Sequence, residues 1–578
     1  MFVSYILASV IAIPTMFSKA ELVTAMPKAG GDYFYISRSM GLVVGIIAGF
    51  SSWFSLSLKG AFALIGMAAY AEMIIPVPIK IIAVFICVGF LIINFLGIKG
   101  AARWQVVMVL GLFTVLLSFV SIGFGRINIE RYVPFAPFGV KSIFAVSGLV
   151  FISYGGLTKI ASISEEVKNP GRNIPFGMIL ALCIVGILYA VVTFIITGLL
   201  PPEKLYSTLT PISDAAMTFS GVVGATVVAF AALLAFITTA NASIMASSRY
   251  PMAMSRDKLL PAFFERVNKR FKTPHYSLIF TGIFMVSAIL FLELELLVKV
   301  ASALLILLYV FANVAVVIMR ESKLQNYQPK FHSPLYPWVQ ILGMAGSIFL
   351  LLQMGGLILS LCALFLVAGA AWYFIFVGAV VKKEFALIHV IERIIDKELT
   401  GGYLSDELKN ILRERDNIIE DRFDKVIKES QILDLENSLD MEEFFKKVAK
   451  SLSDRMNVKQ ESIYEKLIKR EKESSTVIRP GLAIPHIIVD GEKKFEILLA
   501  RCKEGIRFPG ITKGVNVVFV LVGSKDERNF HLRALAAIAE IAQHPNFDDS
   551  WMNARNEDEL RDIILLSARK RIDVTRRF

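Results

Sequence analysis

The chain divides into a long apolar part and a shorter charged part. Up to residue 381, apolar runs long enough to cross a bilayer as helices alternate with short polar connections. From Lys382 onward, charged residues become dense, and this shift marks a domain boundary. The apolar pattern predicts eleven membrane-spanning helices: Phe2–Ala20, Met40–Tyr70, Ile79–Leu96, Val106–Gly123, Ser142–Ile160, Gly177–Leu199, Val222–Ala246, Tyr276–Phe291, Leu297–Met319, Trp338–Met354 and Gly356–Val381.

The charged part has a different pattern. Met441–Ser453 has helical spacing, whereas Val515–Gly523 is a continuous apolar run of strand length. This alternation predicts a soluble α/β domain over residues 432–578. A multi-span domain over residues 1–381 and a helical linker over residues 382–431 precede it.

Composition and charge support a membrane protein and suggest its orientation. The 578 residues are 55% hydrophobic and 19% charged, with a formal net charge of +12, whereas an average soluble domain is about 25% charged. Positive residues gather in alternate connections, most strongly between Arg249 and Lys272, so these connections and the C-terminal domain are expected on the cytoplasmic side of the cell membrane. We find no nucleic-acid motif and expect membrane lipid, not nucleic acid, as a partner.

The four cysteines have neither paired spacing nor the spacing of metal ligands, so we expect no disulfide, metal site or cofactor.

The predicted topology raises a question about the N-terminus of the chain. Eleven spans with a cytoplasmic C-terminus place Met1 outside, almost at the start of an apolar helix. A missing upstream helix is favoured over a true eleven-span protein.

A small, flexible segment interrupts one apolar run. It reads Ser153-Tyr154-Gly155-Gly156, and glycine weakens a helix by about 1 kcal/mol relative to alanine. An unwound stretch inside a membrane helix exposes carbonyls and amides that can hold a polar substrate. Carbonyls accept hydrogen bonds from an ammonium group, and a helix N-terminus favours a carboxylate. The alternative is that the glycines only allow helices to pack closely.

Two lysines lie within predicted spans. Lys59 falls well inside the second span and Lys159 in the later part of the fifth. A charge inside a membrane costs several kcal/mol and is usually paired or functional. One hypothesis is that one of them titrates and couples uptake to protons. The alternatives are that Lys159 extends its ammonium group to the cytoplasmic interface and that Lys59 is paired.

Several segments of the apolar part resemble the amino acid–polyamine–organocation transporter superfamily. The resemblance covers about residues 1–381 and rests on these pieces, in order: Ala20-Glu21-Leu22, the run from Pro27 to Tyr33, the run from Asn94 to Lys99, the run from Phe151 to Pro170, Arg172-Asn173-Ile174-Pro175, Ser248-Arg249, Ser255-Arg256-Asp257 and Leu259-Leu260-Pro261.

This resemblance implies two inverted repeats of five helices plus two further helices, with the first helix missing here. It implies secondary active transport of an amino acid or related amine, with H+ or Na+ as the coupling ion. Substrate contacts are expected at Ile152, Ser153 and Gly155, within a site that also includes Tyr154 and Gly156. Leu157-Thr158 departs from the aromatic-rich sequence that is usual just after this glycine, so the side-chain specificity is open.

The charged part resembles the fructose–mannitol type IIA component of the sugar phosphotransferase system. The matching pieces are Lys469-Arg470-Glu471, Ser475-Thr476, the run from Ala483 to His486, the run from Gly505 to Phe508, and His531-Leu532. The resemblance implies that His486 is the phosphoryl acceptor, with Arg470 and His531 in support and a phosphocarrier protein as partner. A neutral imidazole that follows an apolar strand and a proline suits this chemistry.

The chain is thus predicted to be an amino acid transporter with a regulatory IIA-like domain, not an enzyme. Two alternatives stay open: a membrane-anchored sensor, and a phosphotransferase component that uses His486. A IIB-type cysteine site is absent from the sequence, which argues against the second alternative as the main activity.

Overall fold

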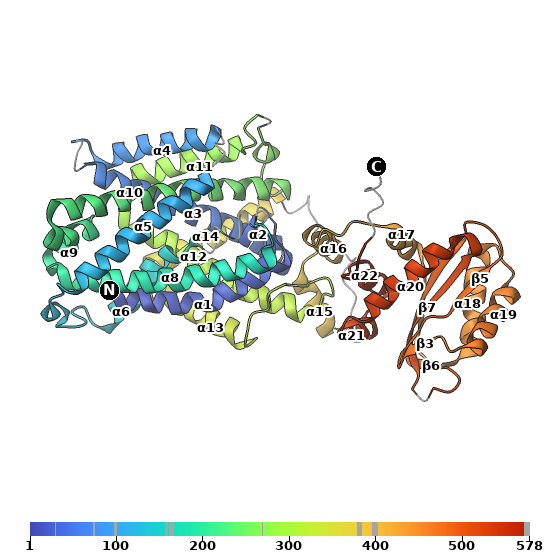
Figure 1. Cartoon of the computed structure of the whole chain (residues 1–578). Helices are drawn as coiled ribbons and strands as arrows, with labels where there is room; N and C mark the ends of the chain where they lie inside the picture. The colour runs from blue at the N-terminus through green and yellow to red at the C-terminus, as the bar shows by residue number, and fades with distance from the viewer. Residues whose placement is uncertain are drawn as a thin grey trace. The chain divides into compact units, whose positions relative to one another are not determined.

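The computed structural model describes residues 1–28, 30–72, 76–96, 101–156, 160, 164, 167–268, 270–377, 384–395, 403–511 and 513–571. The chain forms two compact units, Met1–Asp406 and Glu407–Phe578. Figure 1 shows that the first unit is helical and that the second contains a sheet covered by helices. The helical membrane region and the C-terminal α/β domain predicted from the hydrophobic pattern are both confirmed.

The first unit is built from helices joined by short turns. Eight of its described helices are long and apolar enough to cross a membrane, and three further apolar helices are shorter. Each predicted span falls on one of these helices, whereas the inverted-repeat arrangement stays a prediction. The helices are α1 (Phe2–Ala25), α2 (Gly31–Met40), α3 (Leu42–Glu72), α4 (Ile79–Leu96), α5 (Ala101–Phe124), α6 (Val140–Val150), α8 (Pro170–Leu199), α9 (Pro202–Ser207), α10 (Pro211–Arg256), α11 (His275–Phe291), α12 (Leu294–Glu321), α13 (Trp338–Gln353), α14 (Gly356–Trp372) and α15 (Ala386–Ile395), with the short turns η1 (Ile129–Tyr132), η2 (Phe151–Tyr154), η4 (Ala262–Glu265) and η5 (Tyr373–Val377).

The helices α3 and α12 form the centre of this unit. Most of their side chains are buried, whereas few of the side chains of α4 and α5 are. The exposed side chains of α4 and α5 include many large apolar ones, and extended apolar surface of this kind is typical of contact with lipid. Because α3 and α12 lie at the centre, their side chains reach the interior of the helical unit.

Buried ion pairs fix the end of the bundle that carries α2. They join α1 to α2, α2 to the residue that follows α10, and α1 to α12. Removing one partner of a buried pair leaves the other charge uncompensated, so each pair holds its helices in register. The pairs have N···O distances of 2.6 to 2.9 Å: Lys19–Asp32, Arg38–Asp257 and Arg320–Glu21.

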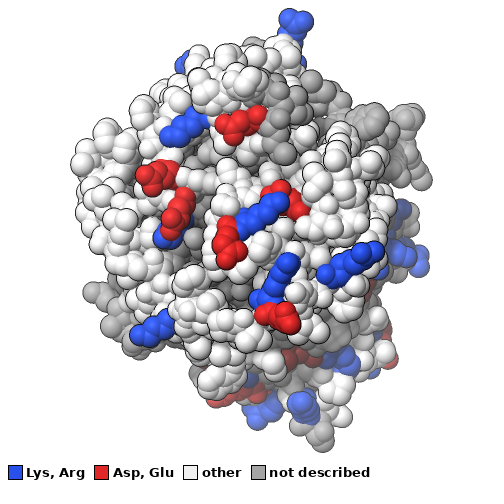
Figure 2. All heavy atoms as spheres, turned by 90° about the vertical axis from the view of Figure 1, so that its left-hand side faces the viewer, with Lys and Arg blue, Asp and Glu red and all other residues white. Residues whose placement is uncertain are grey.

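The opposite end of the bundle carries α9. Figure 2 shows basic and acidic side chains scattered together over the described part of this face, among uncharged residues. One such pair joins Lys204 of α9 to Asp214 of α10, with an N···O distance of 3.8 Å. Positive and negative charges therefore offset each other on this face, in contrast to the strongly basic connection between Arg249 and Lys272.

The second unit is a mixed sheet with helices on both faces. The strand order is β1-β6-β7-β4-β3, with β2 also paired to β6 and β5 to β7. The strands β6 and β7 run antiparallel, and β5 is parallel to β7. The elements are α16 (Tyr403–Arg415), α17 (Arg422–Glu429), β1 (Gln431–Leu435), β2 (Leu439–Asp440), α18 (Met441–Met456), α19 (Gln460–Glu473), β3 (Val477–Arg479), β4 (Leu482–Ala483), β5 (His486–Val489), β6 (Phe495–Arg507), β7 (Val515–Ser524), η6 (Lys525–Glu527), α20 (Arg528–Ala542), α21 (Phe547–Asn553) and α22 (Glu557–Leu565).

Alternation along the strands divides the interior into two cores. On β6, Leu498 and Ala500 pack with α18 and α19, whereas Ile497 and Leu499 pack with α17 and α20–α22. Successive strand residues point to opposite faces, and a sheet covered on both faces needs apolar side chains on both. This explains why the central strands read as continuous apolar runs in the sequence.

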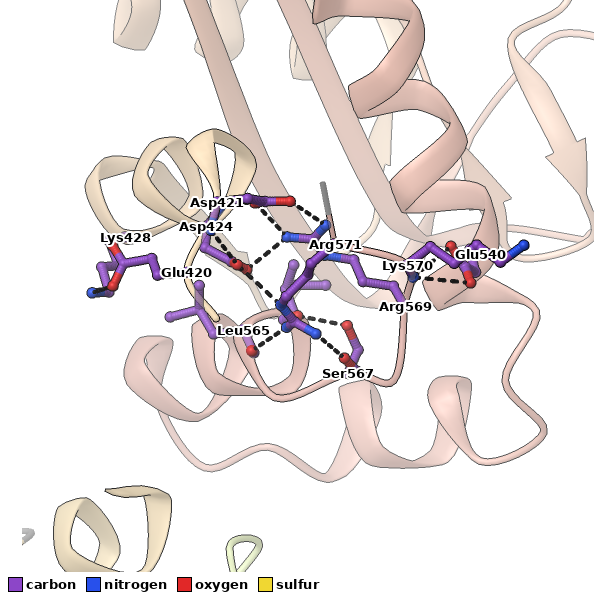
Figure 3. A network of polar contacts seen from close by, with 11 residues as sticks. Glu420, Asp421, Asp424, Lys428, Glu540, Leu565, Ser567, Arg569, Lys570 and Arg571 are labelled. Atoms are coloured by element: carbon purple, nitrogen blue, oxygen red, sulfur yellow. Dashed lines mark hydrogen bonds and ion pairs between the residues drawn. The ribbon is translucent and has the colours of Figure 1, made fainter. Parts of the chain in front are cut away.

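The helix α17 lies in the range predicted to be linker, but its Phe423 and Ile427 are buried in a core of the α/β unit. The segment after α22 holds α17 in place, as Figure 3 shows. Arg569 donates to both carboxylate oxygens of Asp421 at 2.7 and 2.8 Å and lies 2.8 Å from Asp424 Oδ1. Burial alone would raise the pKa of Asp421, but the hydrogen bonds from Arg569 and from the Asp424 backbone outweigh it and lower this pKa.

Candidate substrate and phosphoryl sites

The candidate substrate site of the helical unit is centred on η2, a single 3-10 turn that directly follows α6. The amide of Gly155 donates to the Ile152 carbonyl at 3.0 Å and closes this turn. Among the described residues, no atom lies within 4 Å of the position that a Cβ would take at Gly156, and this residue is exposed. The predicted break is therefore a turn, and no described residue crowds its second glycine.

Side chains of α12 satisfy backbone groups at this turn. The Ser302 hydroxyl donates to the Leu149 carbonyl at 2.7 Å and accepts from the Ile152 amide at 3.2 Å. The Tyr309 hydroxyl donates to the Tyr154 carbonyl at 3.2 Å. Backbone polar groups inside a membrane need protein partners, so Ser302 and Tyr309 allow the helix to break here.

Sequence reasoning missed Ser302 and Tyr309. Both are buried polar residues on the apolar helix α12, and their i, i+7 spacing places them on one helix face. That spacing of polar residues in an otherwise apolar segment was the available signal. The sequence could not show which backbone groups they reach.

Lys59 of α3 also reaches the turn. Its Nζ atom donates to the Ile152 carbonyl at 2.7 Å and lies 3.5 Å from the Ser153 carbonyl. The sequence suggested Lys59 as a coupling residue, separate from the substrate site, and the structure places it at that site. Lys159, Leu157 and Thr158 lie outside the described residues.

Tyr154 and Ser153, the remaining two residues of the predicted site, differ in their contacts and exposure. The Tyr154 hydroxyl donates to the Tyr5 carbonyl at 2.8 Å, and its ring packs against Tyr189 at a centroid distance of 5.8 Å. Tyr154 therefore presents its backbone, and not its hydroxyl, to the turn. Ser153 is partly exposed.

The second candidate site surrounds His486, at the start of β5. The preceding segment is fixed by backbone bonds: the Leu521 amide donates to the Pro485 carbonyl, and the Ile484 amide to the Thr476 carbonyl, each at 2.9 Å. The Nδ1 atom of His486 lies 2.9 Å from the Ile484 carbonyl. Because a carbonyl can only accept, Nδ1 carries the proton and Nε2 keeps its lone pair.

Arg470 and His531 complete this site. The Nη2 atom of Arg470 lies 3.2 Å from His486 Nε2, and the ring centroids of His486 and His531 are 5.8 Å apart. A Cβ at Gly523 would lie 3.2 Å from His531 Nδ1, so this glycine makes room for the second ring. The structure thus brings together the three residues that the sequence singled out.

His531 is buried, and its Nε2 atom has no hydrogen-bond partner within the described residues. Burial, and to a lesser extent the charge of the neighbouring His486, lower the pKa of His531 to about 4. At neutral pH His531 is therefore uncharged. Among the described residues, we find no group of three or more histidine, cysteine or acidic side chains placed to hold a metal ion.

We predict that the imidazole of His531 titrates near pH 4 in the folded domain. An unperturbed histidine titrates near pH 6.5, so the unfolded state binds this proton more tightly than the folded state. The stability of the α/β unit should therefore fall as pH drops from about 6.5 to about 4. NMR titration of the domain over residues 407–578 measures the midpoint. A midpoint near 6.5 would contradict the burial of this ring.

Comparison with known proteins identifies both units. Residues 1–384 match the family described as amino acid permease, which covers more than half of the chain. The chain belongs to the amino acid permease family. Residues 425–566 of this permease match the phosphoenolpyruvate-dependent sugar phosphotransferase system EIIA 2 family. The permease therefore combines a multi-pass membrane transporter domain with a C-terminal EIIA-type domain, as the sequence motifs indicated.

Several relatives of the permease are similar over most of its membrane domain. The methylthioribose transporter of Bacillus subtilis (strain 168) is 28% identical over 65% of this chain and 85% of its own. The branched-chain amino acid permease BcaP of the same organism is 25% identical over the same shares. The vacuolar cationic amino acid transporter 2 of Arabidopsis thaliana is 29% identical over 57% of this chain and 55% of its own.

A solved structure is similar to part of the permease as well. The crystal structure of nitrogen regulatory protein IIA-Ntr from Neisseria meningitidis has 24% sequence identity. It covers 25% of this chain and 99% of its own, with a TM-score of 0.23.

Proposed function

We propose that this permease carries amino acids or related amines across the cytoplasmic membrane by secondary active transport. The observation that carries the proposal is the turn at Ile152–Gly156, which breaks an apolar helix, meets Lys59 and has no described atom within 4 Å of the Cβ position of Gly156, in a domain of the amino acid permease family. Broken helices of this kind form substrate sites in transporters that work by alternating access. The substrate is held at the turn while the surrounding helices open to one side and then to the other.

The coupling ion and the orientation are part of the same proposal. H+ or Na+ drives uptake, with Lys59 and Lys159 as the candidate coupling lysines. The basic connection between Arg249 and Lys272 lies on the cytoplasmic side, together with the EIIA-type domain. The names of the relatives include transporters of branched-chain and of cationic amino acids. They therefore support an amino acid substrate and leave its net charge open.

The test is uptake of a panel of labelled amino acids into liposomes that contain the purified full chain, with and without a pH gradient. Saturable uptake, with competition between chemically related amino acids, is the expected result. Absence of uptake for every amino acid would overturn the transport proposal and favour a sensor that binds a substrate without moving it.

We predict that Gly155→Val lowers amino acid uptake by about tenfold or more, because a misplaced binding group is costly. A Cβ at this position would lie 3.1 Å from the Ile152 carbonyl oxygen and 3.2 Å from Leu305. The valine would therefore push apart the groups that form the turn. Gly111→Val is the matched control, because no atom of the described residues lies within 4 Å of its Cβ position. Equal uptake by the Gly155 and Gly111 variants would contradict a substrate site at the turn.

A second candidate function is phosphoryl acceptance by the EIIA-type domain, and the geometry of His486 favours it. The Nε2 lone pair would attack the phosphorus of a phosphohistidine on a phosphocarrier protein. A new N–P bond forms as the donor's N–P bond breaks, and the electron pair of that bond stays on the donor imidazole. Arg470 would neutralise charge on the phosphoryl oxygens. In this proposal the domain regulates transport according to its phosphorylation state.

A further inference from the structure

Lys59 places a positive charge at the turn that the proposed transport function uses. It comes from the centre of α3, and its Nζ atom donates to the Ile152 carbonyl at 2.7 Å. No acidic side chain lies within ion-pair distance of Lys59 in the part of the chain that the structure describes. A lysine within a membrane domain is usually paired with an acidic group or functional. Here its hydrogen-bond partners are the backbone carbonyls of the turn.

Lys59 lies beside the first glycine of this turn. The ammonium group lies 3.4 Å from the position that a Cβ would take at Gly155. It already uses the Ile152 carbonyl, which would otherwise attract the ammonium group of a ligand. At such short range in a protein interior, a like charge is repelled and an opposite charge attracted far more strongly than in water.

We propose that Lys59 is a specificity-determining residue, through which the permease selects substrates that carry a carboxylate and no net positive charge. This inference rests on the proposed transport function, because Lys59 selects only if the turn is the substrate site. A zwitterionic amino acid places its carboxylate beside Lys59. A cationic amino acid brings a second positive charge into the same site and is rejected.

The experiment compares uptake of labelled leucine and labelled lysine by the full chain in liposomes at pH 7. The wild type should prefer leucine. In Lys59→Met the leucine-to-lysine ratio should fall by about tenfold or more, because the internal positive charge is gone. Lys59→Arg keeps the charge and should keep most of the preference. Lys80→Met is the matched control: Lys80 also donates to a backbone carbonyl, that of Leu290 at 2.8 Å, but at an exposed position.

The outcomes separate this inference from the transport proposal. No uptake of either amino acid by the wild type would overturn the selectivity inference, whereas only absence of uptake for the whole amino acid panel would overturn the transport proposal. Uptake of leucine with an unchanged ratio in Lys59→Met, or the same fall in Lys80→Met, would overturn the selectivity inference alone. Lys59→Met can be folded and still not transport. In that case, thermal-shift titration with leucine and with lysine measures binding without requiring a transport cycle. A tenfold gain in the relative binding of lysine then supports the inference, and no gain overturns it.

Discussion

The substitution His486→Gln should reduce phosphoryl acceptance by the EIIA-type domain by about a thousandfold or more, the scale seen when an attacking nucleophile is removed. In the structure the His486 Nδ1 atom donates its proton to the Ile484 carbonyl, so Nε2 carries the lone pair and accepts from Arg470 Nη2. A glutamine amide has a similar size but no basic nitrogen. The measurement is acid-labile phosphate on the full chain after incubation with a phosphorylated phosphocarrier protein.

The control for this experiment is His544→Gln. His544 lies in the same unit just after α20 and is exposed. Its replacement should leave phosphoryl acceptance unchanged. Equal labelling of the His486 variant and the wild type would place the acceptor elsewhere. Absence of labelling in the wild type would contradict phosphoryl acceptance and favour a domain that senses by binding alone.

The substitution Arg501→Ala should destabilise the α/β unit by about 3–5 kcal/mol, the cost of breaking a buried ion pair from one side. Arg501 is almost fully buried on β6, and its Nε and Nη2 atoms donate to the two carboxylate oxygens of Asp434 at 2.9 and 2.5 Å. Its Nη1 atom donates to the carbonyls of Trp551, Met552 and Ala554 at the end of α21. The alanine would leave all of these acceptors without their donor.

Denaturant unfolding of the domain over residues 407–578 measures the effect, and Arg479→Ala is its matched control. Arg479 donates to both carboxylate oxygens of Asp548 at 2.6 Å, but both side chains are partly exposed. Exposed pairs contribute about 0–1 kcal/mol, so the control should lose little stability. A similar loss of unfolding free energy in both variants would mean that burial of the ion pair does not determine how much stability is lost.

Much of this architecture could be predicted from the pattern of apolar residues, glycines and short motifs along the sequence. Helix positions in the membrane domain follow from apolar runs, because a membrane segment must satisfy its backbone internally and must be long enough to cross. The break at Gly155 was visible because glycines interrupt such a run. The motif from Ala483 to His486, together with Arg470 and His531, predicted the second candidate site, and the structure brings these residues together.

The boundary of the α/β unit could be predicted less well. The charge pattern from residue 382 to residue 431 indicates an exposed helical linker, and α17 does lie there. Its two buried side chains, Phe423 and Ile427, are too few to distinguish a packed helix from a solvated one. Contacts with Arg569, more than a hundred residues later in the chain, hold this helix, and sequence spacing does not report contacts over that range.

The sequence by itself determined the two domains, their secondary structure and the residue types of both candidate sites, because hydrophobic periodicity and local motifs act over a few residues. The tertiary structure alone decided that Lys59, Ser302 and Tyr309 meet the turn at Ile152. These side chains come from α3 and α12, and packing of whole helices sets their approach. The identity of a polar residue follows from the sequence, whereas its hydrogen-bond partner follows from the fold that buries it.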